Sequence, residues 1–419
     1  MDHAFAPESA EEAREIVAEA LASGSALDIS GTGSKRAMGR PTDLAHRLSV
    51  ARLSGVALYE PEELVLRAGP GTPMAQIALH LEQHGQMLAF EPPDLGPLFG
   101  EPAGTGTLGG TIACNLAGPR RVKSGAARDH FLGVEAVSGR GELFRSGGRV
   151  VKNVTGYDLC KLMAGAWGTL GVMTEVTVKV LPAPERTRTV LVACHDAARA
   201  LRAMTEALSS ANDVSAAAWL PGKIAAASAV SYVAGAGAAL CALRVEGIGA
   251  SVAARCEALR SLLAPFGAVE ELHTHNSKTL WTELRDVAPF APDPAADIAP
   301  LHSVPHPSAV WRVSLPPTAA PAFVDAVTRA LDAELFLDWG GGLVWVAVTG
   351  ADDGGAAAIR SAIPPGGGHA TLLRAPDALR LAVPVFQPES PGVVALTKRL
   401  KEAFDPRGIL NPGRMHEGL

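Results

Sequence analysis

Apolar and polar positions alternate with helical and strand periods along the first part of the chain. Ser9 and Glu12 form a capping box before apolar residues at helical spacing, and Gly24 ends that pattern, so residues 10–23 are expected to form a helix. The other elements predicted before residue 183 are a strand over 26–30, a strand over 64–68, a helix reaching Gly85 with Thr72 as its N-cap and Pro73 at its first position, and strands over 133–137, 142–144 and 171–180.

The second part of the chain, from about residue 183 to 390, is rich in alanine and alternates helices with strands. The predicted helices cover 197–208, 252–263 and 321–331, and the predicted strands cover 239–245, 310–314 and 343–348. This part starts with the proline-bearing segment PAPERTR, which is typical of a linker. A last helix over 393–404 leads into the C-terminal tail. We therefore expect three parts, over 1–182, 183–390 and 391–419.

Composition narrows the class of protein. The 419 residues carry a net charge of −6 and only 19% are charged, so no positive field favours a nucleic acid or an anionic membrane surface. Five cysteines without a CxxC pair indicate reduced thiols rather than a disulfide framework. The uncharged stretch 224–243 is mostly Ala, Gly and Ser, which favours a helix and a strand of a globular domain over a membrane span. The first residues do not resemble a secretory signal, so a cytoplasmic protein is expected.

The first candidate binding segment is the glycine loop Gly31-Thr32-Gly33-Ser34-Lys35, directly after a predicted strand. Its backbone N–H groups, with a hydroxyl from Thr32 or Ser34, can converge on a pyrophosphate. A Rossmann fingerprint would need Gly or Ala at position 36, where this chain has Arg, and no Walker sequence closes the loop. A simple turn is therefore an equal alternative.

Glycine is also concentrated further along the first part. Residues 100–125 hold seven glycines, an excess that indicates sharp turns or close approach of the backbone to another group. Within this region the segment 104–115, GTGTLGGTIACN, leaves little side-chain bulk, so a flat aromatic ligand can lie on it. A tight crossing of two chain segments would use the same glycines. A third segment, over 152–171, again combines glycines with hydroxyl and amide side chains.

Together the three segments resemble the FAD-binding domain of the vanillyl-alcohol oxidase and p-cresol methylhydroxylase superfamily, in which separate loops enclose the dinucleotide. The resemblance runs from about residue 8 to 182 and recurs in the tail DPRGILNPG over 405–413. Three strings more narrowly resemble the FAD-binding subunits of bacterial glycolate oxidase. These strings are VVKNVTGYDLCKLMAGAWGTLGV over 150–172, LWTELRD over 280–286 and VWRV over 310–313.

The resemblance implies a two-domain α+β flavoprotein. Its FAD-binding domain would cover 1–182, a smaller cap domain with an antiparallel sheet would cover 183–390, and 391–419 would return to the FAD domain. FAD would be bound non-covalently, because the first glycine loop has no His for covalent attachment. The implied cofactor-binding residues are Gly31, Thr32, Gly33, Ser34 and Lys35 at the pyrophosphate, Thr107, Leu108, Gly109, Gly110, Thr111, Ala113 and Asn115 along the dinucleotide and ring, Gly118, Ser124, Gly125 and Asp129 in the following turn, Gly168, Thr169, Leu170, Gly171 and Val172 on the adenine side, and Asn411 from the tail.

The chain departs from its relatives in the second domain. Those that oxidise 2-hydroxy acids usually carry a metal motif of the form His-x-Gly-Asp-Gly-Asn-x-His there, and this chain has no such string. The nearest segment, DWGGG from residue 338, offers one carboxylate and no imidazole, so no metal site is expected. The close His pairs, at which metal binding is a minor alternative, are His273 with His275 and His302 with His306.

Arg285 and Arg312 are the candidates for holding a substrate carboxylate, because a guanidinium group can donate two parallel hydrogen bonds to it. An ion pair at a domain interface would explain either arginine equally well. His130 is a candidate proton acceptor, although a structural role is the preferred interpretation.

By resemblance, the chain is an FAD-binding subunit of a complex that oxidises glycolate to glyoxylate. Its implied partners are a paralogous catalytic flavin subunit and an iron–sulfur subunit, and any contact with the inner face of the cytoplasmic membrane would be made through the complex. Because the metal motif is missing, the role expected for this chain is that of the accessory flavin subunit. Two alternatives stay open: a self-sufficient FAD-dependent 2-hydroxy-acid dehydrogenase, and a non-catalytic assembly subunit that has kept the fold but binds no flavin.

Overall fold

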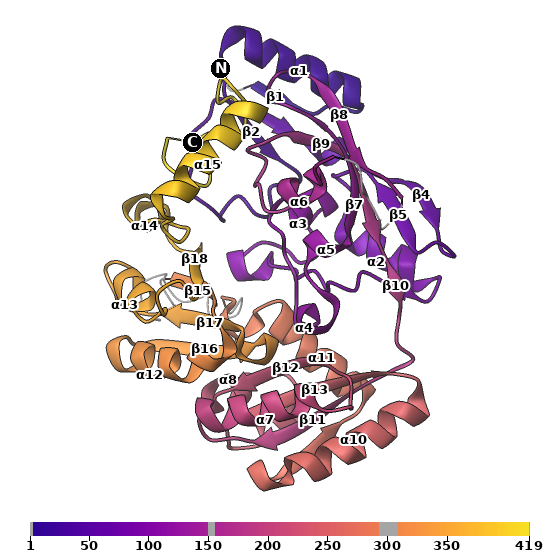
Figure 1. Ribbon diagram of the computed structural model, residues 1–419, viewed down its shortest axis with the longest axis vertical. Coiled ribbons are helices and arrows are strands. Elements are labelled where there is room, and N and C mark those ends of the chain that lie inside the picture. Colours follow the sequence, from indigo (N-terminus) through magenta and orange to yellow (C-terminus); the bar gives the residue numbers. More distant parts are fainter. Residues whose placement is uncertain (1–2, 150–155, 293–308, 419) are drawn as a thin grey trace.

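The computed structural model describes residues 3–149, 156–292 and 309–418, and its sheets form two groups (Figure 1). The first group holds a three-stranded parallel sheet of order β1-β3-β2 and a five-stranded antiparallel sheet of order β4-β5-β9-β7-β8. The strands are β1 His3–Phe5, β2 Leu27–Ser30, β3 His46–Ser49, β4 Val56–Glu60, β5 Val65–Ala68, β7 Phe131–Val137, β8 Leu143–Gly147 and β9 Val172–Lys179. A short pair, β6 Gln86–Met87 with β10 Leu181–Pro182, lies where the chain leaves this group.

Helices of the first group cover and connect these sheets. They are α1 Ala10–Ser23, α2 Met74–Glu82, α3 Leu108–Ala113, α4 Arg121–Ser124, α5 Ala127–His130 and α6 Leu159–Met163. The prediction of α1 is confirmed, because Ser9 Oγ accepts a hydrogen bond from Glu12 N at 3.2 Å and Gly24, at φ 72°, ends the helix.

The predicted N-cap of the second helix was wrong. Pro73 occupies the cap position of α2, and the preceding Thr72 makes other hydrogen bonds. The Thr72 hydroxyl donates to Gly69 O at 2.7 Å and accepts from Gly55 N at 2.9 Å. It therefore ties the turn after β5 to the start of β4 instead of capping the helix.

The second group is one antiparallel sheet of eight strands in the order β14-β11-β13-β12-β16-β17-β15-β18. The strands are β11 Arg186–Ala193, β12 Val214–Leu220, β13 Leu240–Gly247, β14 Val269–Leu272, β15 Ala309–Ser314, β16 Ala333–Asp338, β17 Leu343–Val348 and β18 His369–Arg374. The helices after residue 185 are α7 Ala197–Ser209, α8 Gly222–Ala226, α9 Ser231–Ala234, α10 Gly249–Leu263, α11 Thr274–Arg285, α12 Ala320–Ala330, α13 Ala356–Ser361, α14 Asp377–Ala382 and α15 Pro391–Phe404. An antiparallel cap sheet was expected, and this one has more strands than either sheet of the first group.

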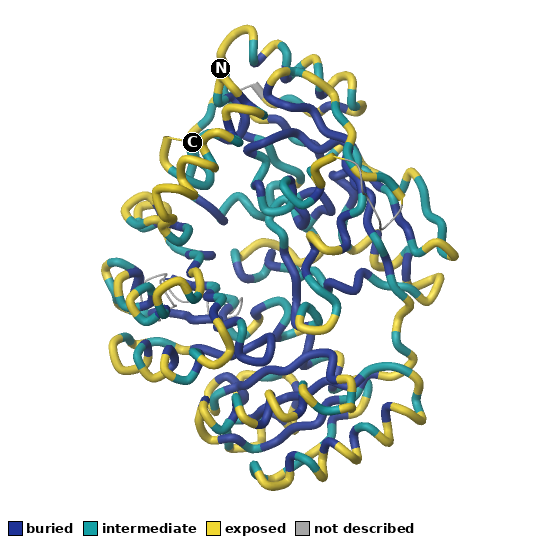
Figure 2. Tube along the Cα trace, viewed as in Figure 1, coloured by how far each residue is buried: buried dark blue, intermediate teal, exposed yellow. Residues whose placement is uncertain are grey.

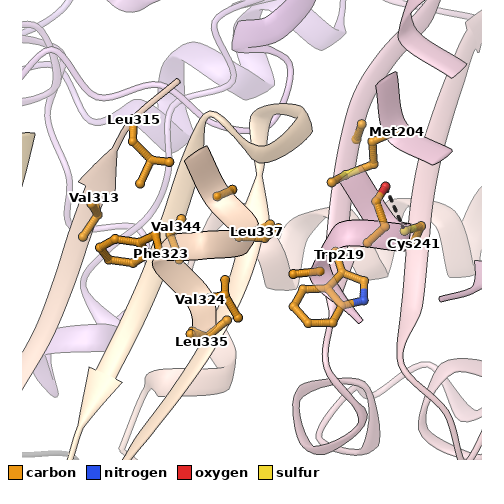
Figure 3. Close-up of a cluster of buried hydrophobic side chains, with 14 of the residues drawn as sticks. Met204, Trp219, Cys241, Val313, Leu315, Phe323, Val324, Leu335, Leu337 and Val344 are labelled. Carbon is orange, nitrogen blue, oxygen red and sulfur yellow. Dashed lines mark hydrogen bonds between the residues drawn. The ribbon is translucent and has the colours of Figure 1, made fainter. Parts of the chain in front are cut away.

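The two faces of the eight-stranded sheet pack against different parts of the chain. On one face, α7, α10, α12 and α13 enclose a buried apolar cluster, part of which Figure 3 shows around Trp219, Phe323 and Leu337. Side chains alternate along each strand, so Phe336, next to Leu337, joins the cluster on the opposite face. That opposite cluster contains α11 and also Leu95 and Leu116 of the first group. The buried inner surfaces of both groups therefore meet. Figure 2 shows buried segments, in dark blue, in both groups.

A buried ionic network also joins the two groups of sheets. Arg244 of β13 donates two hydrogen bonds to the Glu91 carboxylate, at 2.7 and 2.8 Å. Arg120, before α4, donates two to Glu246 at 2.9 and 3.0 Å. Each pair contains one residue from each group. Because both carboxylates and both guanidinium groups are largely out of water, removing one partner would leave a buried charge behind.

Two predictions about element boundaries need correction. The predicted linker PAPERTR is too long, because β11 already begins at Arg186 and pairs with both β13 and β14. The uncharged stretch 224–243 was expected to hold a helix and a strand; it contains two short helices, part of α8 and the whole of α9, followed by the expected strand in β13. Among the residues that the structure describes, no helix has both the length and the apolar character needed to cross a membrane.

The last helix, α15, returns to the first group of sheets through a buried clasp (Figure 1). Lys401 Nζ donates to Asp405 Oδ2 at 2.6 Å, to Leu410 O at 2.7 Å and to Thr169 O at 2.8 Å. The Asp405 carboxylate in turn accepts from Ile409 N and Leu410 N. Leu410 then forms a parallel bridge with Leu27 of β2. The clasp therefore fixes the tail beside the first glycine loop.

Replacing Asp405 with Ala leaves the buried Lys401 ammonium without its anion. We expect Asp405→Ala to lower the free energy of unfolding by about 3–5 kcal/mol. Urea denaturation followed by circular dichroism measures this change. The matched control is Glu402→Ala, which removes an exposed carboxylate from the same helix and should change the free energy by less than about 0.5 kcal/mol. Equal effects of the two substitutions would contradict a stabilising role of the clasp.

Candidate functional site

A hollow lies between the first glycine loop, α3 and the tail, and its space of about 760 Å³ is partly open to solvent. It brings together many of the residues that the sequence pointed to. The predicted cofactor residues that line it are Gly31, Thr32, Gly33, Ser34, Lys35, Thr107, Gly109, Gly110, Ala113, Gly168, Gly171 and Asn411. The three glycine-bearing stretches and the tail therefore converge on one space.

The first glycine loop follows β2 and is held against the second glycine segment. Thr32 Oγ1 donates to Thr105 O at 2.6 Å, and Ser49 Oγ donates to Gly31 O at 2.9 Å. Because the Thr32 hydroxyl already donates its proton to Thr105 O, Ser34 is the better candidate of the two for donating a hydrogen bond to a ligand. A Cβ at Gly31 would lie 2.5 Å from Thr107 Oγ1, so only glycine permits this approach of the two segments.

Lys35 places a cation in the hollow. A Cβ built on Gly106 or Gly110 would lie 3.4 or 3.5 Å from its Nζ, so the ammonium group lies against glycine backbone. Burial lowers the pKa of Lys35, and within the described part of the chain its ammonium group forms no hydrogen bond or ion pair. A desolvated cation without a protein anion is complementary to a ligand phosphate.

The Gly109-Gly110 pair combines the two explanations that the sequence left open. A Cβ at Gly109 would lie 2.6 Å from Pro70 Cβ, so this glycine serves the crossing of two chain segments. Gly110 instead faces Lys35, and its N–H is held at 3.4 Å by Thr107 Oγ1, the N-cap of α3. Gly109 is therefore needed for close packing of two chain segments, and Gly110 is needed to keep the ligand surface open.

Asn411 completes the far wall of the hollow. Its Oδ1 accepts from Ile29 N at 2.6 Å, and its Nδ2 donates to Trp167 O at 2.8 Å. A Cβ at Gly168 would lie 2.7 Å from that Nδ2. One tail side chain thus joins β2 to the third glycine segment, whose residues 152–155 lie outside the described residues.

The remaining predicted cofactor residues do not line the hollow. They are Leu108, Thr111, Asn115, Gly118, Ser124, Gly125, Asp129, Thr169, Leu170 and Val172. Several support the backbone nearby: Asp129 Oδ2 accepts from Ala126 N, and Asn115 Oδ1 accepts from Arg128 N. A Cβ at Gly125 would lie 2.8 Å from Asp129 Oδ2, so these two residues do shape a tight turn.

Sequence reasoning missed some of the residues in the walls. Arg414 lines the hollow and donates to Lys35 O and Arg36 O at 3.1 and 2.9 Å, which fixes the first loop from the tail. Its position just after the tail motif was the available signal. Cys114 also lines the hollow, and burial raises the pKa of its thiol to about 11, so it presents a neutral, weakly polar surface.

Arg285 is already engaged by the protein. Its guanidinium makes two hydrogen bonds of 2.7 Å to Asp286, which also accepts from Asp94 N. The ion-pair interpretation therefore accounts for Arg285. His130 is buried, and one ring nitrogen lies 2.8 Å from Ser124 O, which supports the structural role preferred for it.

The second group of sheets holds a buried carboxyl in the DWGGG segment, which the sequence analysis compared with a metal motif. Asp338, at the end of β16, accepts from Trp339 N at 2.7 Å, and burial raises its pKa to about 7. Within the described ranges, no three His, Cys, Asp or Glu side chains gather closely enough to hold a metal ion. The pair His302 and His306 lies outside the described residues.

Comparisons with known proteins connect these observations. Residues 1–147 match the family model described as FAD binding domain, and residues 387–415 match FAD linked oxidases, C-terminal domain. Glycolate oxidase subunit GlcE of Escherichia coli (strain K12) is 36% identical over 409 residues, which are 97% of this chain and 97% of that protein. Glycolate oxidase subunit GlcD of Bacillus subtilis (strain 168) is 34% identical over 151 residues, which are 36% of this chain and 30% of that protein.

Solved structures show the same fold at low sequence identity. p-Cresol methylhydroxylase with substrate bound has a TM-score of 0.69 at 15% identity, over 98% of this chain and 88% of that one. Alkyldihydroxyacetonephosphate synthase has a TM-score of 0.69 at 18% identity, over 98% of this chain and 75% of that one. The expected α+β fold of the p-cresol methylhydroxylase type is therefore confirmed.

FAD is the cofactor that these matches establish, and the hollow fits it. Glycine backbone gives close access for an extended dinucleotide, and the unpaired Lys35 ammonium supplies positive charge for its pyrophosphate. We propose that the lining residues of the first loop hold the pyrophosphate, and that α3 and the third segment hold the rest of the cofactor.

Removing the Lys35 charge should weaken FAD binding. A hydrogen bond to a charged partner contributes about 1.5–3 kcal/mol, so we expect Lys35→Met to raise the FAD dissociation constant roughly 10- to 100-fold. Fluorescence titration of the apoprotein with FAD measures it. The control is Lys398→Met, which removes an exposed lysine from α15 and should leave the constant unchanged. Equal constants for both variants would refute the placement of the pyrophosphate.

The raised pKa of Asp338 predicts a dependence of stability on pH. Between about pH 4 and 7 the folded chain keeps a proton that the unfolded chain releases, so this group makes stability fall as pH rises. We expect Asp338→Asn to be more stable than the parent at pH 8, by at most about 4 kcal/mol, and equal to it near pH 4. Urea denaturation across this range is the measurement, with the exposed Asp352→Asn as control. A constant difference between Asp338→Asn and the parent at all pH values would contradict the shift.

Proposed function

The chain belongs to the family of glycolate oxidase subunit GlcE, among the FAD-linked oxidases, and from this membership we propose that it is the FAD-binding subunit of a complex that oxidises glycolate or a closely related 2-hydroxy acid. The match to GlcE over 97% of both chains is the observation that carries the proposal. The hollow lined by the glycine segments supports it, because it provides a cofactor site within this chain.

Within such a complex we assign this chain the accessory flavin role. Oxidation of a 2-hydroxy acid requires a group that accepts the hydroxyl proton and one that polarises the alkoxide. The DWGGG segment, the nearest that this chain has to a His-rich metal motif, offers only Asp338, which is 2% exposed. His130, the other candidate proton acceptor, hydrogen bonds to the backbone. These observations support binding of the flavin by this chain more directly than oxidation of the acid by that flavin.

The proposal extends to partners and location. The similar proteins GlcE and GlcD are both named as subunits of glycolate oxidase, which supports a complex of several chains. We propose that a paralogous flavin subunit removes the hydride and that an iron–sulfur subunit receives the electrons. We further propose a cytoplasmic location, with any contact to the membrane made through the complex.

The isolated chain should bind FAD without reducing it. We expect the purified protein, reconstituted with FAD, to show a flavin absorption band that glycolate does not bleach under anaerobic conditions. Addition of the co-purified partner subunits should restore rapid bleaching. Stopped-flow absorbance at the flavin maximum measures both.

Each other outcome selects an alternative. Rapid bleaching of the isolated chain would replace the accessory role with a self-sufficient FAD-dependent dehydrogenase. A chain that takes up no FAD at all would be a non-catalytic assembly subunit that has kept the fold.

A further inference from the structure

Two arginines near the hollow differ from the other arginines inside the molecule. The Arg121 guanidinium, on α4, lies 4.1 Å from the centre of the Trp339 ring, and that of Arg312, on β15, lies 5.0 Å from it. Within the described residues, neither forms an ion pair with a carboxylate or a side-chain hydrogen bond. By contrast, Arg120, Arg244 and Arg285 each make two hydrogen bonds to a carboxylate.

The charges around the two arginines compensate them only in part. Burial lowers the pKa of Arg121, and the Asp129 charge opposes this shift without forming an ion pair with Arg121. Burial, and then the Arg121 charge, lower the pKa of Arg312 to about 10. Asp338, the acid whose charge acts on Arg312, is itself buried, and burial raises its pKa to about 7. His369 of β18 feels both arginines, and burial together with their charges lowers its pKa, so it is neutral. Arg121 and Arg312 still keep part of their surface accessible. Two like charges therefore lie at one aromatic ring, and neither side chain is completely withdrawn from the surface.

The ring that carries both cations is held firmly in place. Trp339 Nε1 donates to Gly118 O at 3.0 Å, and its backbone N–H donates to Asp338. The residue adopts φ 54°, a left-handed conformation that is costly for a bulky side chain and indicates a position fixed by its surroundings. A fixed aromatic face keeps two guanidinium groups close together without an anion between them.

One apolar cluster connects the arginine pair with the hollow. Trp339 and Leu116 belong to the apolar cluster on the inner face of that sheet. Cys114 and Trp167, which line the hollow, pack against the same cluster. Trp339 also binds Gly118 O, four residues after Cys114, so the pair lies on the cap side of the segment that follows α3.

We propose that Arg121 and Arg312, held over the Trp339 ring, form a binding site for the carboxylate of a small hydroxy acid. The inference rests on the proposed function for the identity of the acid, whereas the site itself rests on the unpaired cations. Guanidinium groups bind a carboxylate through paired, charge-assisted hydrogen bonds, and two of them supply both charge and orientation. The site gives this chain a means of binding the acid even where it does not oxidise it.

Calorimetric titration of the FAD-loaded chain with oxalate tests the site. Oxalate carries carboxylates but no C–H bond to oxidise, so the heat reports binding alone, and a shift of the flavin absorption band reports proximity to the cofactor. We expect Arg312→Met and Arg121→Met each to weaken oxalate binding at least tenfold, and Arg312→Lys to weaken it less. The control Arg128→Met removes an exposed charge seven residues from Arg121 and should bind like the parent.

The remaining outcomes separate the two proposals. Absent binding in the FAD-loaded parent, or equal binding by the parent and Arg312→Met, overturns the arginine site and leaves the proposed function intact. Inorganic phosphate binding more tightly than oxalate and glycolate overturns the carboxylate assignment. Failure to take up FAD defeats the proposed function, and the same titration of the apoprotein then decides on the site. Circular dichroism and FAD content identify any variant that is misfolded, and Arg312→Lys then carries the comparison.

Discussion

The side-chain amide of Asn411 is the interaction on which the cofactor site depends. It hydrogen bonds to the backbone of Ile29 and of Trp167, which lie 382 and 244 residues away in the chain. The walls of the hollow keep their positions only while Asn411 holds these two segments together. The Lys401–Asp405 clasp holds the tail that carries Asn411, and Arg414 continues the contact to the first glycine loop. The binding surface is thus a product of long-range hydrogen bonds and not of one local motif.

The structure uses charge in two distinct ways. At the junction of the two groups of sheets, guanidinium and carboxylate groups pair completely, as Arg244 does with Glu91 and Arg120 with Glu246, and these pairs fix the relative position of the sheets. Around the hollow, Lys35, Arg121 and Arg312 lack such partners within the described residues. Unpaired interior cations cost folding free energy, so they are expected where a ligand supplies the missing anion.

Much of the fold could be predicted from local patterns. The helix over residues 10–23 has a capping residue, a repeating apolar face and a terminal glycine, and all three act within the segment itself. Strands such as β12, with its run of alanines, were not predicted because both their faces are buried in the assembled sheet, which leaves no alternation of apolar and polar residues. Thr72 was assigned to the wrong role because its partner, Gly55, is set by the pairing of β4 with β5.

The site was predictable to a similar degree. Glycine, with its small volume and wide conformational range, marked the segments that line the hollow. The pairing of Arg285 and the unpaired state of Arg312 could not be deduced, because both depend on which carboxylates the fold brings near. Trp339, whose ring holds two cations, gave no signal in the sequence beyond its position beside a glycine run.

The position of Asn411 also has a consequence for dividing the chain into fragments. A fragment of residues 1–182 contains all three glycine segments but lacks the side chain that binds the backbone of Ile29 and of Trp167. The first glycine loop would lose this closing contact although its own sequence is intact. The cofactor site therefore cannot be excised together with the first group of sheets alone.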